Sequence, residues 1–313
     1  MNILTKVGAL LALAMTVQAL PEAATLDAAK QQAAQEKRDI MLDFTGTDWC
    51  TACIHLRTKI IESTEFEDAY GKKFVLVSVD FPRNPQLVAQ IPDDEKRRRE
   101  NLLTSYRISG LPGVVLMDEK GMPYEIIGGA RRTPADYMPL VEAGLQKRAK
   151  RDAAFAKAAT QSGMEQAQTL AAGLMELPEA CRDKYVAEID IINAADPENT
   201  LGFKGLGSET VLFVQQMEQL RDLLSTFRGK LAPEELKESI VKLDTFLKQP
   251  NLHPEVRQQA LSAMGDSFAL LGDFMRMYEY YKQALEQAPN SRAAKRIRGN
   301  VENFEQNVLP NLK

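Results

Sequence analysis

The apolar residues in the first half of the chain follow two spacings, one typical of buried strands and one typical of helices. The runs DIMLDF at 39–44 and FVLVSVDF at 74–81 are short and largely apolar, and the second is rich in β-branched residues. Such runs predict buried strands. Strands and helices alternate, which predicts an α/β fold with a mixed central sheet flanked by helices. The other predicted elements are helices at 53–59, 65–70, 92–106 and 134–148, and a hairpin of strands at 114–118 and 124–127.

The second half of the chain shows only the helical spacing. After residue 148 the strand-like runs disappear, and apolar residues recur at three and four positions among many Ala, Gln, Glu, Leu and Lys residues. This pattern predicts an all-α domain of helical hairpins over residues 149–313. Within it, residues 258–291 are similar to one tetratricopeptide repeat, which is a pair of packed helices. The matching residues are Met264, Gly265, Phe268, Gly272, Tyr281, Ala284 and Pro289.

The start of the chain has the pattern of an export signal. Lys6 precedes an apolar run at 7–17, and small residues up to Ala19 stand where a signal peptidase cleaves. The apolar run is much shorter than the roughly 20 residues that span a bilayer. We therefore expect a cleavable signal peptide at 1–19 and an exported protein, periplasmic or extracellular. A short buried N-terminal helix is the alternative.

Composition and charge restrict the classes of function. The chain has 39 Lys and Arg residues against 43 Asp and Glu residues, a net charge of −4. Because no overall basic field attracts phosphate backbones, we expect no nucleic-acid partner. The 3 cysteines and 2 histidines leave little material for a structural zinc site. We therefore expect any chemistry to depend on few residues.

Two cysteines in the motif Cys50-Thr51-Ala52-Cys53 carry the candidate chemistry. The motif follows a predicted strand and opens a predicted helix, which places the two sulfurs one helical turn apart, close enough for a disulfide. The amides and dipole at a helix N-terminus favour a thiolate at Cys50, which makes it the attacking group. Cys53, one turn further, would then resolve the mixed disulfide by attacking Cys50.

Other interpretations of these cysteines remain open. In an exported protein, Cys50 and Cys53 can form a structural disulfide. Metal binding together with His55 is a second alternative, although no second pair of ligands completes such a site. Haem attachment is excluded because Ile54, not histidine, follows Cys53. For Cys181 we expect a buried free thiol, with an intermolecular disulfide as the alternative.

The residues around the motif resemble the thioredoxin superfamily over about residues 27–148. The stretch from Phe44 to Cys50, together with that from Val79 to Arg83, is most similar to exported bacterial thioredoxin-like proteins with a DWCxxC motif. The start Asp48-Trp49-Cys50 also resembles the periplasmic end domain of transmembrane disulfide reductases. The resemblance implies a thioredoxin-like domain over residues 20–148 and thiol–disulfide oxidoreductase activity. The residues that carry it are Asp43-Phe44, Trp49 to Cys53, Val79 to Arg83, Leu111-Pro112 and Gly128-Gly129.

The resemblance also implies roles for single residues. Leu111-Pro112 would be a cis-proline loop facing the disulfide, and the backbone of Leu111 would pair with an extended substrate segment. Trp49 would shield the edge of the disulfide. Asp43 would be a buried carboxylate that exchanges a proton with Cys53. An ordinary strand acid at a sheet edge is the alternative for Asp43, which stands one residue further from the motif than is typical of thioredoxins.

The sequence therefore favours an exported thiol–disulfide oxidoreductase whose catalytic residues are Cys50, Cys53 and Asp43. Such an enzyme needs no organic cofactor and no metal. Its partners would be protein thiol or disulfide substrates and an unidentified electron donor or acceptor. The helical domain would bind a protein partner or pair two subunits. The alternative is a non-catalytic binding module, in which the helical domain recruits a partner and the cysteines form a structural disulfide. The direction of electron flow is left open by the motif interior Thr51-Ala52.

Overall fold

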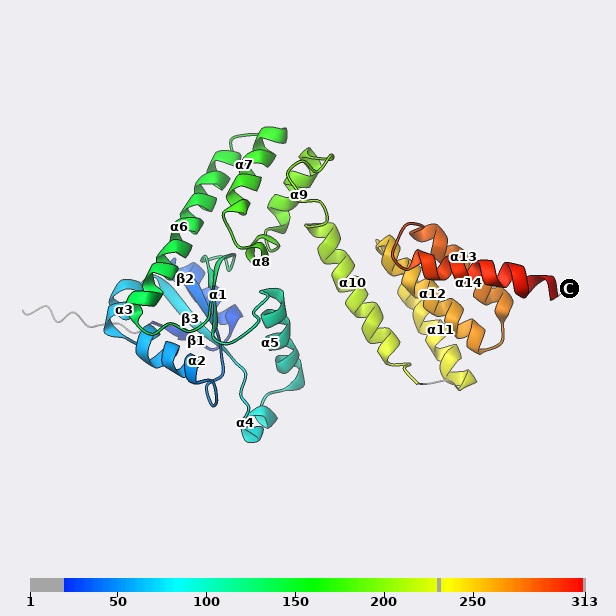
Figure 1. Cartoon of the computed structure of the whole chain (residues 1–313), viewed down its shortest axis with the longest axis horizontal. Coiled ribbons are helices and arrows are strands. Elements are labelled where there is room, and N and C mark those ends of the chain that lie inside the picture. Colours follow the sequence, from blue (N-terminus) through cyan, green and yellow to red (C-terminus); the bar gives the residue numbers. More distant parts are fainter. Residues whose placement is uncertain (1–19, 230–231, 312–313) are drawn as a thin grey trace, which may run out of the picture. The chain divides into compact units, whose positions relative to one another are not determined.

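A computed structural model describes residues 20–229 and 232–311 of the chain. The expected signal peptide at 1–19 lies outside these residues. The chain divides into two compact units, the first ending at Gly202 and the second beginning at Phe203. Each unit is described by itself (Figure 1).

The first unit is built on a five-stranded sheet with the order β1 (Glu22–Ala23), β3 (Phe74–Asp80), β2 (Asp39–Thr45), β4 (Gly113–Met117) and β5 (Pro123–Gly128). β1, β3 and β2 are parallel to one another, whereas β4 runs antiparallel to β2 and β5 antiparallel to β4. The predicted mixed sheet is therefore confirmed. The two-residue strand β1 is not among the predicted elements.

The central strand β2 is buried along its whole length, and its two faces differ. Ile40, Leu42 and Phe44 point to one face and join a core cluster with residues of helix α1 (Leu26–Glu36). Because side chains alternate along a strand, Asp43 points to the opposite face. A carboxylate thus lies inside the unit.

Helices cover both faces of the sheet, and polar side chains cap several of them. Thr25, Ser63 and Asn84 accept hydrogen bonds from backbone N–H groups in the first turns of the helices that they precede. α1 and α4 are not among the predicted helices, and the helix after Cys50 continues into a π-helical segment, η1. In addition to α1, the helices are α2 (Thr51–His55), η1 (Leu56–Ile61), α3 (Thr64–Tyr70), α4 (Pro85–Gln90), α5 (Asp93–Ser105) and α6 (Pro134–Ala158).

Helix α6 is longer than the sequence pattern suggested, and it changes the division of the chain. A helix ending near Arg148 was expected, but no Gly or Pro follows until Gly163, and α6 continues to Ala158. The expected domain boundary at residue 148 therefore falls inside α6. The first unit also includes α7 (Gly163–Met175), α8 (Glu179–Arg182) and α9 (Val186–Ala195).

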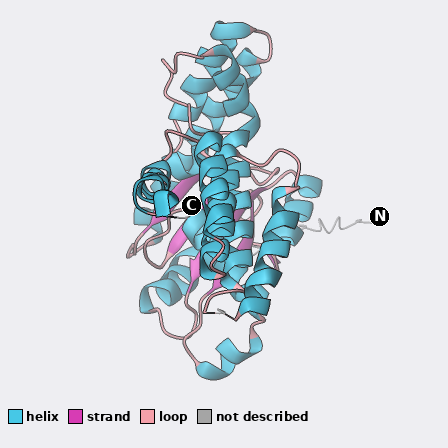
Figure 2. Cartoon of the chain, turned by 90° about the vertical axis from the view of Figure 1, so that its right-hand side faces the viewer, coloured by secondary structure: helices cyan, strands magenta, loops and turns pink. Residues whose placement is uncertain are grey.

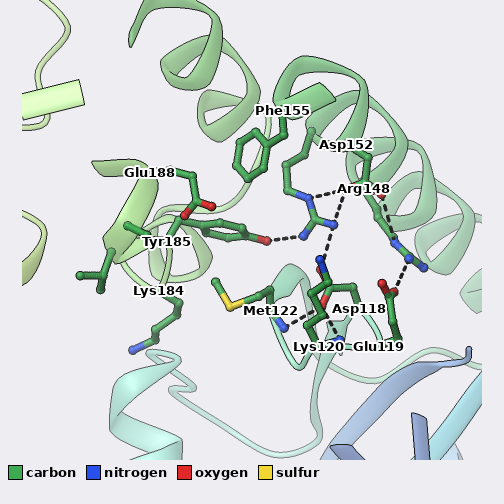
Figure 3. A pocket seen from close by; sticks show the side chains of 13 residues that line it. Asp118, Glu119, Lys120, Met122, Arg148, Asp152, Phe155, Lys184, Tyr185 and Glu188 are labelled. Atoms are coloured by element: carbon green, nitrogen blue, oxygen red, sulfur yellow. Dashed lines mark hydrogen bonds and ion pairs between the residues drawn. The ribbon is translucent and has the colours of Figure 1, made fainter. Parts of the chain in front are cut away.

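A buried ion pair explains why these additional helices belong to the first unit. Arg151 on α6 is 3% exposed and forms an ion pair with Asp118, which follows β4, at 2.9 Å. Arg151 also donates to the hydroxyl oxygen of Tyr185, whose own O–H donates to the carbonyl of Pro123 at 2.9 Å. These contacts connect α6, the β4–β5 hairpin and the start of α9. A pocket of about 530 Å³ lies at this place (Figure 3). Five of its lining residues form ion pairs with one another: Asp118, Glu119, Arg148, Arg151 and Asp152.

The described elements of the second unit are all helices, and the strands drawn in magenta in Figure 2 are those of the sheet in the first unit. Its buried apolar residues form two clusters, one around Phe246 and Met264 and one around Tyr281 and Ile297, and Met277 packs against both. The predicted helical second half is confirmed, whereas the tetratricopeptide character of residues 258–291 stays a prediction. In the described residues, no helix of either unit is both long and apolar enough to cross a membrane. The helices are α10 (Ser208–Ser225), α11 (Pro233–Leu247), α12 (Pro254–Leu270), α13 (Phe274–Gln287), α14 (Ala294–Asn307) and the 3₁₀ turn η2 (Leu309–Asn311).

Candidate functional site

Cys50 and Cys53 form a disulfide at the point where the chain leaves β2 and enters α2. Their Cα atoms are 5.2 Å apart. Cys50 is the N-cap of α2, and its Sγ accepts a hydrogen bond from the backbone N–H of Cys53 at 3.2 Å. Cys50 is 7% exposed and Cys53 is 1% exposed. The outer sulfur is therefore that of Cys50, and Cys53 lies behind it.

The loop that precedes Cys50 is attached to the end of β3. The backbone N–H of Thr47 donates to one carboxylate oxygen of Asp80 at 2.8 Å, and the Thr47 hydroxyl donates to the other at 2.9 Å. Gly46 lies so close to Trp49 that a Cβ there would be 2.6 Å from the indole nitrogen. A side chain at position 46 would displace the indole, so the loop needs glycine at this position.

Trp49 is fixed by the segment that follows β3. Its indole N–H donates to the carbonyl of Phe81 at 2.7 Å. The guanidinium carbon of Arg83 lies 3.4 Å from the centre of the indole ring, which is a cation–π contact. The carboxylate of Asp48 accepts hydrogen bonds from the backbone N–H groups of Arg83, at 3.0 Å, and Asn84, at 2.6 Å. The sequence pattern singled out these motif residues but did not predict that they contact one another.

The peptide bond between Leu111 and Pro112 is cis. It lies directly before β4, whose first residue, Gly113, pairs with Phe44 near the end of β2. Since β2 leads from there into the loop before Cys50, the cis peptide and the disulfide lie at the same end of the sheet. Leu111 is half-buried and Pro112 is buried.

A pocket of about 360 Å³ lies beside the disulfide and is lined by both Asp43 and Cys53. Asp43 is 2% exposed, and its Oδ1 atom has no hydrogen-bond partner among the described residues. Burial raises the pKa of Asp43 to about 7; the charge of Arg57 acts in the opposite direction, and those of Glu22 and Asp80 raise it further. The side chain can therefore exchange a proton near neutral pH. The remaining lining residues are Glu22, Thr45, Thr47, Ile54, Arg57, Thr58 and Ser78.

Two other candidate residues lie outside this arrangement. The Nε2 atom of His55 forms a hydrogen bond with the carbonyl of Arg132 at 2.9 Å. Cys181 on α8 is fully buried and forms no disulfide, and burial raises its pKa to about 12, so its thiol stays protonated. Within residues 20–229 and 232–311, no group of three or more His, Cys, Asp and Glu side chains is arranged to hold a metal ion.

Comparison with known proteins places this site in a family. The family model described as a thioredoxin-like domain matches residues 26–144. The chain is 31% identical over 121 residues to the disulfide bond reductase DsbH of Chlamydia pneumoniae, which covers 38% of this chain and 70% of that protein. It is 28% identical over 94 residues to the thioredoxin-related protein DsbJ of the same organism, covering 29% of this chain and 25% of DsbJ.

A solved structure of a DsbH oxidoreductase is similar to 45% of this chain and 95% of its own, with 27% sequence identity and a TM-score of 0.37. The DsbH relative is matched over more than two thirds of its length. The residues matched by the family model include strands β2 to β5 and the disulfide. The chain therefore belongs to the thioredoxin-like family, and its Cys50–Cys53 pair is that of a thiol–disulfide oxidoreductase.

Proposed function

We propose that this protein is exported and reduces disulfides of protein substrates. The observation that carries the proposal is the Cys50–Cys53 disulfide at the start of α2, with the Asp43 carboxyl in the pocket behind it. The direction, reduction of substrates, rests on the similarity to a protein named disulfide bond reductase. Electrons would come from a dithiol donor that restores the reduced cysteine pair.

In the reduced enzyme, the Cys50 thiolate attacks a substrate disulfide, and one substrate sulfur leaves as a thiolate. This forms a mixed disulfide between Cys50 and the other substrate sulfur. The Cys53 thiol then loses its proton to the Asp43 carboxylate, and the Cys53 thiolate attacks Cys50. The second substrate thiolate leaves, and the enzyme is left with the Cys50–Cys53 disulfide. The substrate has gained two electrons, and the enzyme has lost two.

The local geometry supports a division of labour between the two cysteines. Cys50 is the more exposed sulfur, and its position as N-cap of α2 favours the thiolate through the helix dipole. Cys53 is almost fully buried and shares its pocket with Asp43. A base with a pKa of about 7 can both accept and release a proton in a neutral compartment.

We further propose that Leu111, Pro112 and Trp49 hold the substrate beside Cys50. The cis peptide before Pro112 and the half-buried Leu111 lie at the same end of the sheet as the disulfide. A substrate strand can form backbone hydrogen bonds with Leu111 there, as in other cases of strand addition. The indole of Trp49, held by Phe81 and Arg83, would cover the edge of the disulfide.

The reduction potential of the Cys50–Cys53 pair tests the redox function and its direction. Trp49 is the single tryptophan, so its fluorescence in glutathione buffers reports the redox state of the adjacent Cys50–Cys53 pair. We expect a reduction potential near −270 mV, roughly that of thioredoxin. A value near roughly −120 mV would mark a donor of disulfides and contradict the proposed direction. A pair that glutathione and stronger dithiols cannot reduce would favour a structural disulfide.

Substitutions of the cysteines complete this test. We expect Cys50→Ser to lower protein disulfide reduction to the uncatalysed rate, because no attacking sulfur remains. Cys53→Ser should still attack but should accumulate the mixed disulfide, visible by mass spectrometry. Cys181→Ser is the matched control, since this buried thiol lies on α8 and takes no part in the exchange. Retained turnover in Cys50→Ser would overturn the proposal.

The raised pKa of Asp43 predicts how stability depends on pH. Between pH 4 and 7 the folded protein holds a proton at Asp43 that the unfolded chain has lost, so the free energy of unfolding falls as pH rises through this range. Above pH 7 the buried, ionised Asp43 lowers the free energy of unfolding by an amount on the order of 4 kcal/mol. Asp43→Asn should remove it, raising stability at pH 8 while changing it little at pH 4.

Denaturant unfolding of the oxidised protein, followed by Trp49 fluorescence, measures this dependence. Asp68→Asn is the control, because Asp68 is exposed on α3. Parallel pH curves for the native protein and Asp43→Asn would contradict the assignment of a proton to buried Asp43.

Export is proposed from the sequence of residues 1–19, which lie outside the described residues. Bacteria that produce the full chain should release from their envelope fraction a protein that begins at Leu20. Intact-mass spectrometry of that protein measures the cleavage. Removal of the apolar run at 7–17 should keep the protein in the cytoplasm. Cytoplasmic accumulation of the uncleaved full chain would contradict export.

We also propose that the helical second unit binds a protein partner or a second copy of the chain. Leu270, Phe274 and Met275, around the turn between α12 and α13, are large apolar side chains with exposures of 59%, 46% and 45%. Such a group of exposed apolar side chains is typical of interaction surfaces.

Sedimentation of the full chain tests pairing at this surface. We expect a concentration-dependent mass above that of a monomer, and a monomer after the double substitution of Phe274 and Met275 by Ser. Val241→Ser on α11, an isolated position with 64% exposure, is the control. A native chain that stays monomeric at all concentrations would contradict self-association.

A further inference from the structure

Arg57 shares the pocket with the two groups that exchange the proton. It lies four residues after Cys53, so both side chains lie on the same face of the helix formed by α2 and η1. Arg57 and Asp43 both line the pocket of about 360 Å³. The mechanism described above gives Arg57 no role, although an arginine stays charged at every physiological pH.

A network of polar side chains holds the guanidinium of Arg57 in place. It forms ion pairs with Glu22 of β1 at 2.6 Å and with Glu62, which follows η1, at 2.7 Å. It also donates to the hydroxyl of Ser78 at 3.3 Å, and Ser78 in turn donates to Glu22 at 2.9 Å. Ser78 is the direct neighbour of Asp43 in the pairing of β3 with β2. The network therefore extends from solvent, where Glu22 is 42% exposed, to the residue beside the buried carboxyl.

Four elements bring titratable or charged groups toward Asp43. Arg57 contributes a positive charge, whereas Glu22 of β1 and Asp80 of β3 contribute negative charges. Tyr137 of α6 is neutral, since burial and the nearby Asp43 hold its pKa well above the usual value, and its hydroxyl has no partner among the described residues. The hydrogen bond from Arg57 keeps the pKa of Glu22 below its usual value, so Glu22 is ionised. The charge of Arg57 thus opposes the effect of Glu22 and Asp80 on the pKa of Asp43.

We propose that Arg57 is a positioning residue for proton exchange at Asp43, held over the pocket by Glu22, Glu62 and Ser78. Its fixed charge stabilises the ionised carboxylate that accepts the proton of Cys53, and Glu22 partly offsets that charge. Without Arg57, Asp43 would remain protonated at neutral pH and would accept the proton more rarely. The proposal rests on the proposed role of Asp43 as the proton acceptor.

The pKa of Asp43, measured by carbon NMR titration of the oxidised full chain, is the first test. Arg57→Gln should raise this pKa by about one unit, because an opposite charge at close range is lost. Arg57→Lys should restore most of the native value. Glu22→Gln should lower the pKa, since it removes a negative charge. Asp68→Asn is the control: Asp68 is exposed on α3 and does not line the pocket.

The outcomes separate this proposal from the proposed function. The titration uses oxidised protein without substrate, so it does not depend on catalysis. A shift in Arg57→Gln no larger than that in Asp68→Asn, or no rescue by Arg57→Lys, would overturn the role of Arg57. The second measurement is the pH profile of mixed-disulfide resolution, which should move with the pKa. If the pKa of Asp43 shifts but the pH profile of mixed-disulfide resolution does not, Arg57 acts on the charge of Asp43, but Asp43 is not the proton acceptor.

Discussion

The arrangement of the site depends on one costly feature, the burial of the Asp43 carboxyl on the central strand. An ionised carboxylate without hydrogen-bond partners is strongly disfavoured in a protein interior, and the usual response is a raised pKa. Phe44 points to the face of β2 that packs on the core cluster with α1. Because neighbouring side chains point to opposite faces of a strand, Asp43 points to the face toward α2. Cys53 lines the same pocket. The fold therefore keeps a proton-exchanging group next to the inner sulfur, at a cost in stability.

The hydrogen bonds that hold the loop before Cys50 do not involve the disulfide. Thr47 is bound by Asp80, Asp48 binds the backbone after Phe81, and the indole of Trp49 binds the carbonyl of Phe81. These contacts use backbone groups and carboxylates that are the same in the oxidised and reduced protein. Reduction of the disulfide breaks none of these hydrogen bonds, so the loop before Cys50 keeps its anchors.

Local patterns were sufficient for part of this structure. The strands β2 and β3 could be recognised because a strand that is buried on both faces has a nearly continuous run of apolar residues. The cysteine motif could be recognised because the spacing of its two cysteines matches one helical turn. α1 was missed because it is rich in Ala and Gln and buries only Ala29 and Ala33, which gives a weak periodic signal. The contacts of Arg57 with Glu22 and of Arg83 with Trp49 join residues more than 30 positions apart, and no local spacing encodes them.

The two acids on β2 lie in different surroundings, although both are buried. Asp39 and Asp43 are both buried and, four residues apart on a strand, both point to the same face. Asp39 accepts a hydrogen bond from the hydroxyl of Tyr124 at 2.7 Å and pairs with Arg148, so its charge has partners that oppose the effect of burial on its pKa. Asp43 has an oxygen without a partner, and Arg57 acts on it across a pocket. Burial raises the pKa of both carboxyls, but only Asp39 has hydrogen-bonding partners that oppose this effect, and only Asp43 lines a pocket together with a cysteine.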